Sequence, residues 1–207
     1  MKYILGSHNS LSFSGAAKWY LKPFTFVAKC QSKTLKEQFY DYNVRYFDIR
    51  ITFDKHNNIR SSHGSMIWKY DVERALSELN HMARNAYEPV YVRLVLECNS
   101  KSKRQEKLDD LFIQYCMHFQ SMYPYLLFVG GRRKYDWKKL VEFNTEEPSL
   151  DDKYSSTTSP FGPKKNNFWD KIDDWWPWLY AATHNKKIRR KGTDKDVLFL
   201  DYINIGI

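Results

Sequence analysis

The sequence predicts an α/β protein in which parallel strands are connected by helices. Apolar strand-like segments alternate along the chain with segments whose apolar residues recur at helical spacing. Parallel strands need long crossover connections, which are usually helices, so this alternation favours a mainly parallel sheet. The 207 residues are enough for one domain with a buried core, at about 150 residues per domain. Periodicity alone leaves open whether the sheet is open or closed.

The first half of the chain contains four expected elements. A short apolar segment over residues 3–7 is the first strand, and a turn-rich stretch follows it. Thr34 and Glu37 have the spacing of a capping box, so a helix is expected to begin after Thr34. Residues 44–53 form a long strand-like segment. Asp71 is a candidate N-cap, and the apolar residues behind it share one helical face: Val72, Ala75, Leu76, Leu79, Met82 and Ala83.

The second half repeats this alternation. A proline precedes each of two expected strands, over residues 90–97 and 125–130. Between these strands, five apolar side chains recur at helical spacing: Leu108, Leu111, Phe112, Tyr115 and Phe119. The last expected strand spans residues 197–203. Residues 144–167 are rich in Pro, Ser, Thr, Asp and Lys, which indicates a long loop.

Composition and charge narrow the class of protein. The hydrophobic fraction of 43% and the charged fraction of 28% exclude a disordered chain. No run approaches the ~20 apolar residues of a membrane span, and residues 1–6 lack the core of a signal peptide. We therefore expect an intracellular protein or a leaderless form of a secreted one. Cys30, Cys98 and Cys116 form no CxxC pair, which argues against a disulfide framework or a zinc ribbon.

A net charge of +9 and an aromatic fraction of 17% favour an anionic partner. Nucleic acid, an acidic membrane surface and a phosphorylated small molecule all fit this description. The sequence contains no recognisable nucleic-acid-binding motif, and its basic residues are spread along the chain. We therefore expect no nucleic-acid partner.

Charged residues interrupt three of the expected strands. In residues 44–53, Asp48 and Arg50 share the face opposite to an apolar face. Arg93 and Glu97 repeat this pattern in the next strand, and Asp201 does so in the last. Because a buried charge is costly unless it is paired or used, one interpretation is a structural ion pair inside the sheet. The other is a shared site at the carboxyl ends of the strands, where α/β proteins place their chemistry.

Two histidines follow strand-like segments and suggest the chemistry of such a site. His8 follows the first strand, and His63 follows the Asp48 strand and a turn. Imidazoles titrate near neutrality, so two of them can act as general base and general acid. An arginine such as Arg50 can stabilise charge on pentacoordinate phosphorus, and a carboxylate such as Asp201 can fix one imidazole tautomer. These groups suit cleavage of a phosphodiester next to a hydroxyl group. Each histidine taken alone is more often inert.

Three short motifs in this region resemble the phosphatidylinositol-specific phospholipase C family. They are residues 6–10 (GSHNS), 45–50 (RYFDIR) and 62–64 (SHG), in the order and spacing of the X-type catalytic domain. The resemblance implies that residues 1–207 form a single, small and irregular (β/α)8 TIM-like barrel. It also implies that Asp201 pairs with the histidine of the first motif.

The resemblance implies a role for each of these residues. His8 would take the proton of the inositol 2-hydroxyl, and His63 would protonate the diacylglycerol oxygen. Arg50 would stabilise the phosphorane, with Asp48 orienting the guanidinium. The expected products are diacylglycerol and inositol 1,2-cyclic phosphate, which makes the enzyme a phosphorus–oxygen lyase.

Cofactor use separates two designs within the family. Arg50 stands where bacterial members carry an arginine in place of a metal, so the resemblance implies no cofactor. The alternative is a calcium-dependent enzyme with Asn9, Asp48 and Glu97 as metal ligands. Further residues are candidates for binding the head group of phosphatidylinositol or a related phosphodiester: Asn9, Glu97, Arg132 and Arg133.

Two further segments favour contact with an anionic membrane. Four tryptophans lie close together: Trp169, Trp175, Trp176 and Trp178. Tryptophan is enriched at membrane interfaces, although packing of these rings within the fold is the more common explanation for such a cluster. Residues 186–191 are basic and favour a solvated loop, and the functional alternative is attraction to anionic lipid. We expect a monomer, and the alternative function is a non-catalytic module that binds anionic head groups or nucleic acid.

Overall fold

The computed structural model describes residues 3–97, 105–133, 140–143, 145–153 and 176–207, and confirms the α/β class. Six strands run parallel in the order β7, β8, β1, β2, β5, β6. They are β1 (Ile4–Ser7), β2 (Val44–Phe53), β5 (Val90–Glu97), β6 (Leu126–Arg133), β7 (Leu150–Lys153) and β8 (Val197–Leu200). In the described residues, β6 and β7 form the two ends of this order and do not pair with each other.

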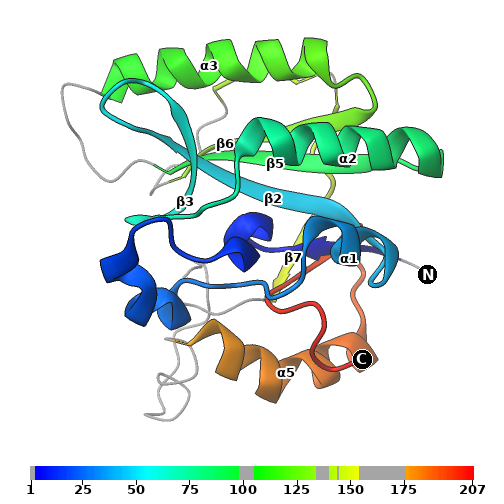
Figure 1. Cartoon of the computed structure of the whole chain (residues 1–207). Coiled ribbons are helices and arrows are strands. Elements are labelled where there is room, and N and C mark those ends of the chain that lie inside the picture. Colours follow the sequence, from blue (N-terminus) through cyan, green and yellow to red (C-terminus); the bar gives the residue numbers. More distant parts are fainter. Residues whose placement is uncertain (1–2, 98–104, 134–139, 144, 154–175) are drawn as a thin grey trace.

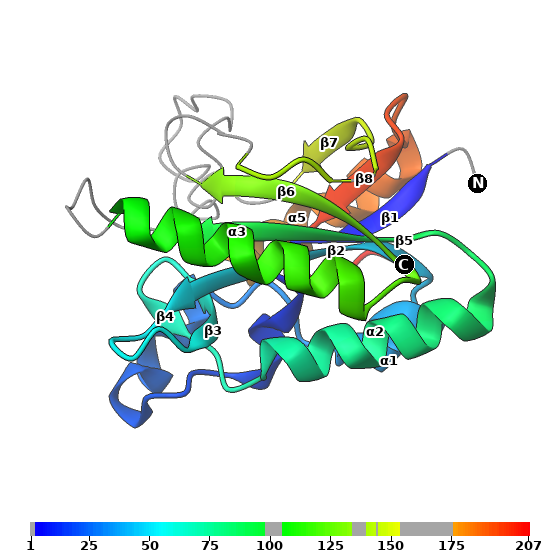
Figure 2. The same cartoon turned by 90° about the horizontal axis from the view of Figure 1, so that it is seen from above.

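Two short strands make the sheet irregular, as expected. β3 (Ile59–His63) pairs antiparallel with the carboxyl end of β2, and β4 (Met66–Ile67) pairs antiparallel with β3. In the described part of the chain the sheet therefore has eight strands, of which six rather than eight are parallel. Figure 2 shows the arrowheads of β2 and β6 at the same end of the sheet, which is the end that carries the site described below.

Two predicted helix starts are confirmed by their caps. Before α1 (Leu35–Tyr40), the Thr34 hydroxyl accepts the Glu37 N–H at 3.3 Å, and the Thr34 N–H donates to Glu37 Oε2 at 2.8 Å. This reciprocal pair is a capping box. Before α2 (Val72–Ala86), the Asp71 carboxylate accepts an N–H of the first helical turn at 2.8 Å. The predicted apolar face of α2 is buried against the sheet.

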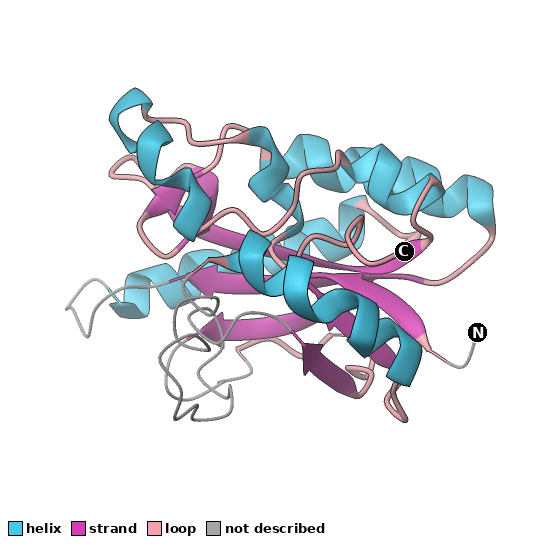
Figure 3. Cartoon of the chain, turned by 90° about the horizontal axis from the view of Figure 1, so that it is seen from below, coloured by secondary structure: helices cyan, strands magenta, loops and turns pink. Residues whose placement is uncertain are grey.

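The other helices of the described residues complete the arrangement seen in Figure 1. They are α3 (Gln105–Met122), α5 (Pro177–Lys191) and two 3-10 helices, η1 (Ser10–Ser14) and η2 (Trp19–Val27). α2 and α3 lie on one side of the molecule and α5 on the opposite side, where Figure 3 shows it crossing the strands. Among the described residues, no helix combines the length and the apolar character needed to cross a bilayer.

Three details differ from the sequence prediction. Residues 186–191 form the last turns of α5 instead of a loop, because Ile188 packs against the core and Arg189 donates to the Ile203 carbonyl. β7 lies within the segment that was expected to be a loop, where its pairing with β8 outweighs its polar composition. The last strand ends at Leu200, because β1, its partner, also ends there.

The main core lies between the sheet and helices α1 to α3. One face of β2 contributes four apolar side chains to it, as predicted: Phe47, Ile49, Ile51 and Phe53. Aromatic residues of the helices fill the facing space, including Phe39, Phe112 and Phe119. Asp48 and Arg50 on the other face of β2 are equally buried. Strands buried on both faces are normally apolar throughout, so these two charges mark the site.

Candidate active site

The two predicted histidines meet at the carboxyl ends of their strands. His8 directly follows β1, and His63 is the last residue of β3. Their ring centroids lie 5.6 Å apart with the ring planes at 89°. His8 is fully buried and His63 is 7% exposed. The fold therefore places two imidazoles within reach of one small group, with His63 nearer to solvent.

Backbone conformation positions each histidine. Asn9 adopts a left-handed conformation (φ 47°) that turns the chain sharply after His8, and asparagine tolerates this region better than most residues. The Asn9 N–H donates to Asp48 Oδ2 at 3.0 Å, which fixes this turn against β2. A two-residue turn joins β3 to β4 just after His63. Gly64 has φ 60° in this turn, so a residue without a Cβ is favoured there.

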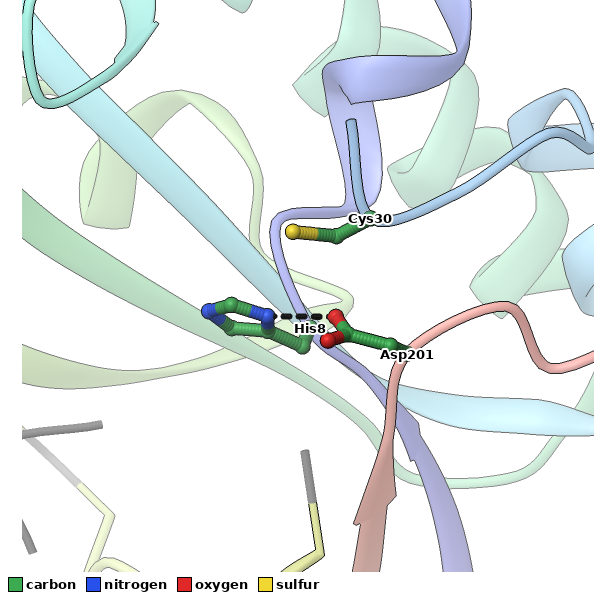
Figure 4. Close-up of side chains that lie close together, drawn as sticks. All are labelled: His8, Cys30 and Asp201. Carbon is green, nitrogen blue, oxygen red and sulfur yellow. Dashed lines mark hydrogen bonds and ion pairs between the residues drawn. The ribbon is translucent and has the colours of Figure 1, made fainter. Parts of the chain in front are cut away.

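The His8 ring is held by a carboxylate. Asp201 directly follows β8, whose pairing with β1 places Leu200 beside Ser7. The His8 Nδ1 and Asp201 Oδ1 atoms are 2.6 Å apart, and both side chains are fully buried (Figure 4). An ionised carboxylate only accepts hydrogen bonds, so Nδ1 carries the proton. In the neutral ring the lone pair is therefore on Nε2, which lies 3.9 Å from Asp48 Oδ2.

Arg50 is buried between two carboxylates. Its Nε donates to Asp48 Oδ2 at 2.7 Å and its Nη1 donates to Glu97 Oε1 at 3.0 Å. Arg50 is 1% exposed, and Glu97 lies at the end of β5. Since the two carboxylates compensate for the desolvation of the guanidinium, its charge is retained and its orientation fixed. Asp48 Oδ2 contacts both Arg50 and His8, so it links the two halves of the site.

The His63 ring is held by the backbone. Its Nδ1 lies 2.9 Å from the carbonyl oxygen of Ala28, in the segment after η2. A carbonyl only accepts, so Nδ1 donates its proton to this oxygen. Any proton that His63 transfers is therefore carried on Nε2. This contact was not predictable, because it joins two segments whose proximity depends on the whole fold.

Cys30 is a neighbour of both histidines that the sequence did not indicate. Its Sγ lies 3.8 Å from His63 Nδ1 and donates to the Ala28 carbonyl at 3.4 Å. Its backbone N–H donates to the Ser12 hydroxyl at 3.0 Å. Burial, followed by the Asp201 carboxylate, raises the pKa of the Cys30 thiol well above its usual range. The thiol is therefore protonated at neutral pH.

The proposed calcium ligands do not fit a calcium ion. Asp48 and Glu97 both accept hydrogen bonds from Arg50, so the guanidinium takes the position of a cation between them. A second cation at this point would be repelled by the fixed positive charge. In the described part of the chain, the Asn9 Nδ2 and Asp48 Oδ1 atoms are buried without a hydrogen-bond partner. Buried polar atoms of this kind normally bond to something, which suits them to bind a ligand hydroxyl.

Of the arginines on the neighbouring strands, the structure describes the side chain of Arg93 but not those of Arg132 and Arg133. The Arg93 Nε lies 3.4 Å from Glu147 Oε1, which also accepts the Tyr46 hydroxyl at 3.2 Å. Glu147 was not predicted, because it lies in a segment without a recognisable motif. Arg132 and Arg133 occupy the end of β6, where the backbone of Arg133 lies in register with that of Glu97 in β5. Their side chains lie outside the described residues, as do Trp169 and Trp175.

Comparison with known proteins identifies the fold. No protein-family model and no curated protein matches the chain. Among solved structures, phosphatidylinositol-specific phospholipase C from Listeria monocytogenes matches with a TM-score of 0.61 and 18% identity, covering 96% of this chain and 87% of that one. A mutant of the same enzyme from Staphylococcus aureus matches with a TM-score of 0.61 and 17% identity, covering 96% and 84%. The chain thus has the fold of these TIM-barrel proteins, which confirms at this level the resemblance that the motifs indicated.

Proposed function

We propose that this chain is a phosphatidylinositol-specific phospholipase C-like phosphodiesterase. It cleaves the glycerol–phosphate bond of phosphatidylinositol to give diacylglycerol and inositol 1,2-cyclic phosphate. The observation that carries the proposal is the pair of buried imidazoles, 5.6 Å apart, beside a guanidinium held in place by two carboxylates. The shared fold supports the substrate class, since the matching structures are named for phosphatidylinositol.

His8 acts as the general base. Because Asp201 keeps the proton on Nδ1, the Nε2 lone pair accepts the proton of the inositol 2-hydroxyl as its oxygen attacks phosphorus. The resulting imidazolium is stabilised by Asp201 at 2.6 Å and by Asp48 at 3.9 Å. General base catalysis of this kind contributes about 10²–10⁴ in rate.

Arg50 stabilises the charge that develops on the phosphorane. Its guanidinium is oriented by Asp48 and Glu97 before the substrate binds, so little reorganisation is needed during the reaction. This fixed charge performs the electrostatic role that a cation has in metal-dependent phosphoryl transfer. We therefore assign no cofactor to the reaction.

His63 acts as the general acid. The Ala28 carbonyl holds its Nδ1 proton, so the imidazolium transfers its Nε2 proton to the diacylglycerol oxygen as the P–O bond breaks. Because His63 is the more exposed of the two rings, the leaving group departs on the outer side of the site. The His8 imidazolium then releases its Nε2 proton and the neutral His63 takes up a proton, both by exchange with solvent, which restores the starting state.

An aromatic surface beside the site is suited to contact with the lipid. It consists of exposed side chains of η2 and the start of α5: Trp19, Tyr20, Phe24, Phe26, Val27, Trp176 and Trp178. η2 has no buried residue, and Trp19 is 78% exposed. The Phe26 and Trp176 rings are 5.4 Å apart and join the two elements, which lie together in Figure 1. Exposed aromatic patches of this kind mark interaction sites.

The aromatic surface leads directly to the catalytic centre. The chain continues from η2 to Ala28, whose carbonyl holds His63. Lys18 and Lys22 lie beside or within η2 and attract anionic lipid, at about 1 kcal/mol for each cation near the surface. A head group would then enter the site while its acyl chains remain in the membrane.

Phosphorus NMR of phosphatidylinositol vesicles treated with the purified protein tests the proposal. We expect the diester signal to be replaced by that of a cyclic phosphodiester, at a rate that EDTA does not lower. A lower rate with EDTA would instead indicate the calcium-dependent mechanism. Vesicle binding without any turnover would contradict the proposal and support a non-catalytic head-group-binding module.

A further inference from the structure

Cys30 completes a group of three potential metal ligands inside the protein. The other two are His8 and Asp201, and one ligand atom from each residue lies within 4.8 Å of the others. All three side chains are fully buried. Figure 4 shows that they converge from three segments that are distant in the sequence: the end of β1, the segment after η2 and the segment after β8. None of the proposed catalytic steps uses the Cys30 thiol.

We propose that His8, Cys30 and Asp201 bind Zn²⁺ or another thiophilic divalent cation, and that the bound metal inhibits the enzyme. Imidazole nitrogen, thiolate sulfur and carboxylate oxygen are the ligands that zinc takes in proteins, often as a set of three with an open fourth position. With zinc–ligand bonds of about 2.0–2.3 Å, these atoms need only small shifts to surround one ion. The inhibitory effect rests on the proposed function, whereas the binding site does not.

The electrostatic surroundings favour a cation at this point. Two carboxylates and one guanidinium act on the thiol, from Asp201, Asp48 and Arg50. Burial, together with the Asp201 carboxylate, raises the pKa of the Cys30 thiol, and the two carboxylates outweigh the single guanidinium in charge. A thiolate ligand selects zinc and similar soft ions over calcium and magnesium. The site is therefore distinct from the calcium ligand set at Arg50, which a cation does not fit.

Metal binding has a defined effect on the protons. The ion replaces the thiol proton of Cys30, which is released to solvent, so binding strengthens as the pH rises. It also bonds to His8 Nδ1, and the imidazole proton then resides on Nε2. A ring with a proton on Nε2 has no lone pair there to accept the proton of the inositol hydroxyl. Zinc therefore locks His8 in the tautomer that cannot act as the base.

Cobalt(II) tests the site without any need for turnover. Titration of the full chain with Co²⁺ should produce a thiolate-to-metal charge-transfer band in the near ultraviolet, which saturates at one ion per chain and is abolished by Zn²⁺. Each of the chain's three cysteines is then tested. We expect the band to be lost in Cys30→Ser and kept in Cys98→Ser and Cys116→Ser. Cys116 is the matched control, because it is an equally buried thiol in α3.

The outcomes separate the site from the enzymatic proposal. Absence of the band in the wild-type chain, or its persistence in Cys30→Ser, would overturn the inference. If Cys30→Ser does not fold, as judged by circular dichroism, Cys30→Ala takes its place. Asp201→Asn should weaken binding by more than the roughly 10–100-fold that loss of an outer-shell partner costs a metal site. Unchanged affinity in Asp201→Asn would exclude this residue as a ligand and overturn the three-ligand site.

A rate measurement tests the inhibition. Zn²⁺ should suppress turnover of phosphatidylinositol by the wild-type enzyme, and EDTA should restore it. At the same zinc concentration, Cys30→Ser should keep its own metal-free rate. Equal inhibition of both proteins would overturn the inhibitory role. If no protein turns over substrate but the cobalt band follows Cys30, the proposed function fails and the metal site stands.

Discussion

Replacement of Asp201 by asparagine tests the step in which His8 accepts a proton, because this step depends on the contact between Asp201 and the His8 ring. The Asp201 carboxylate lies 2.6 Å from His8 Nδ1 in a fully buried pair. A hydrogen bond to a charged group contributes about 1.5–3 kcal/mol, so its loss alone lowers the rate roughly 10–150-fold. The asparagine amide can also donate to Nδ1 and leave the proton on Nε2, which extends the loss to about 10⁴. We therefore expect kcat/KM of Asp201→Asn to fall by roughly 10²–10⁴.

Initial rates on phosphatidylinositol vesicles measure this effect. The matched control is Asp194→Asn, which removes an exposed carboxylate from the segment between α5 and β8 and should leave the rate unchanged. In a His8→Ala background, Asp201→Asn should add little further loss, because both residues serve the same step. An Asp201→Asn enzyme that keeps at least about one tenth of the wild-type kcat/KM would refute the tautomer argument.

Three further predictions concern other parts of the site. His63→Ala should lower kcat by about 10²–10⁴ through loss of the general acid, and an unchanged rate would reject this assignment. Glu97→Ala removes one partner of the buried Arg50 guanidinium and should lower the free energy of unfolding by about 3–5 kcal/mol. Urea denaturation measures this loss, and a value below about 1 kcal/mol would contradict the ion pair. Trp19→Ala should weaken binding to anionic vesicles about tenfold. The control is Tyr87→Ala, which removes an exposed aromatic ring at the end of α2. Equal effects of the two substitutions would count against the aromatic surface.

Local sequence patterns were sufficient to predict much of the framework of the site. The alternation in β2 placed Asp48 and Arg50 opposite the apolar face, and the structure buries both faces in that arrangement. His8 and Asp201 each follow a strand, and parallel pairing of β1 with β8 brings the ends of these strands together. His63 ends β3, which pairs antiparallel with the carboxyl end of β2. These inferences depend only on the two-residue alternation of side chains along a strand and on the geometry of parallel sheets.

Contacts between distant segments were not predictable in this way. Cys30 and the Ala28 carbonyl contact His63 because the tertiary fold brings the segment after η2 to the end of β3, about 35 residues further along the chain. β7 was missed because its polar residues resemble a loop, and its strand conformation depends on pairing with β8. The exposed aromatic residues of η2 carry no periodic signal, so their gathering on one surface with Trp176 required coordinates.

The roles of the two histidines can be separated in one measurement by changing the leaving group. The rates of His8→Ala and His63→Ala are compared on phosphatidylinositol and on an inositol nitrophenyl phosphodiester, whose leaving group departs without protonation. We expect His63→Ala to recover most of its rate on the nitrophenyl substrate, while His8→Ala remains equally impaired on both substrates. Equal impairment of both variants on both substrates, or recovery of His8→Ala alone, would contradict the assignment of base and acid.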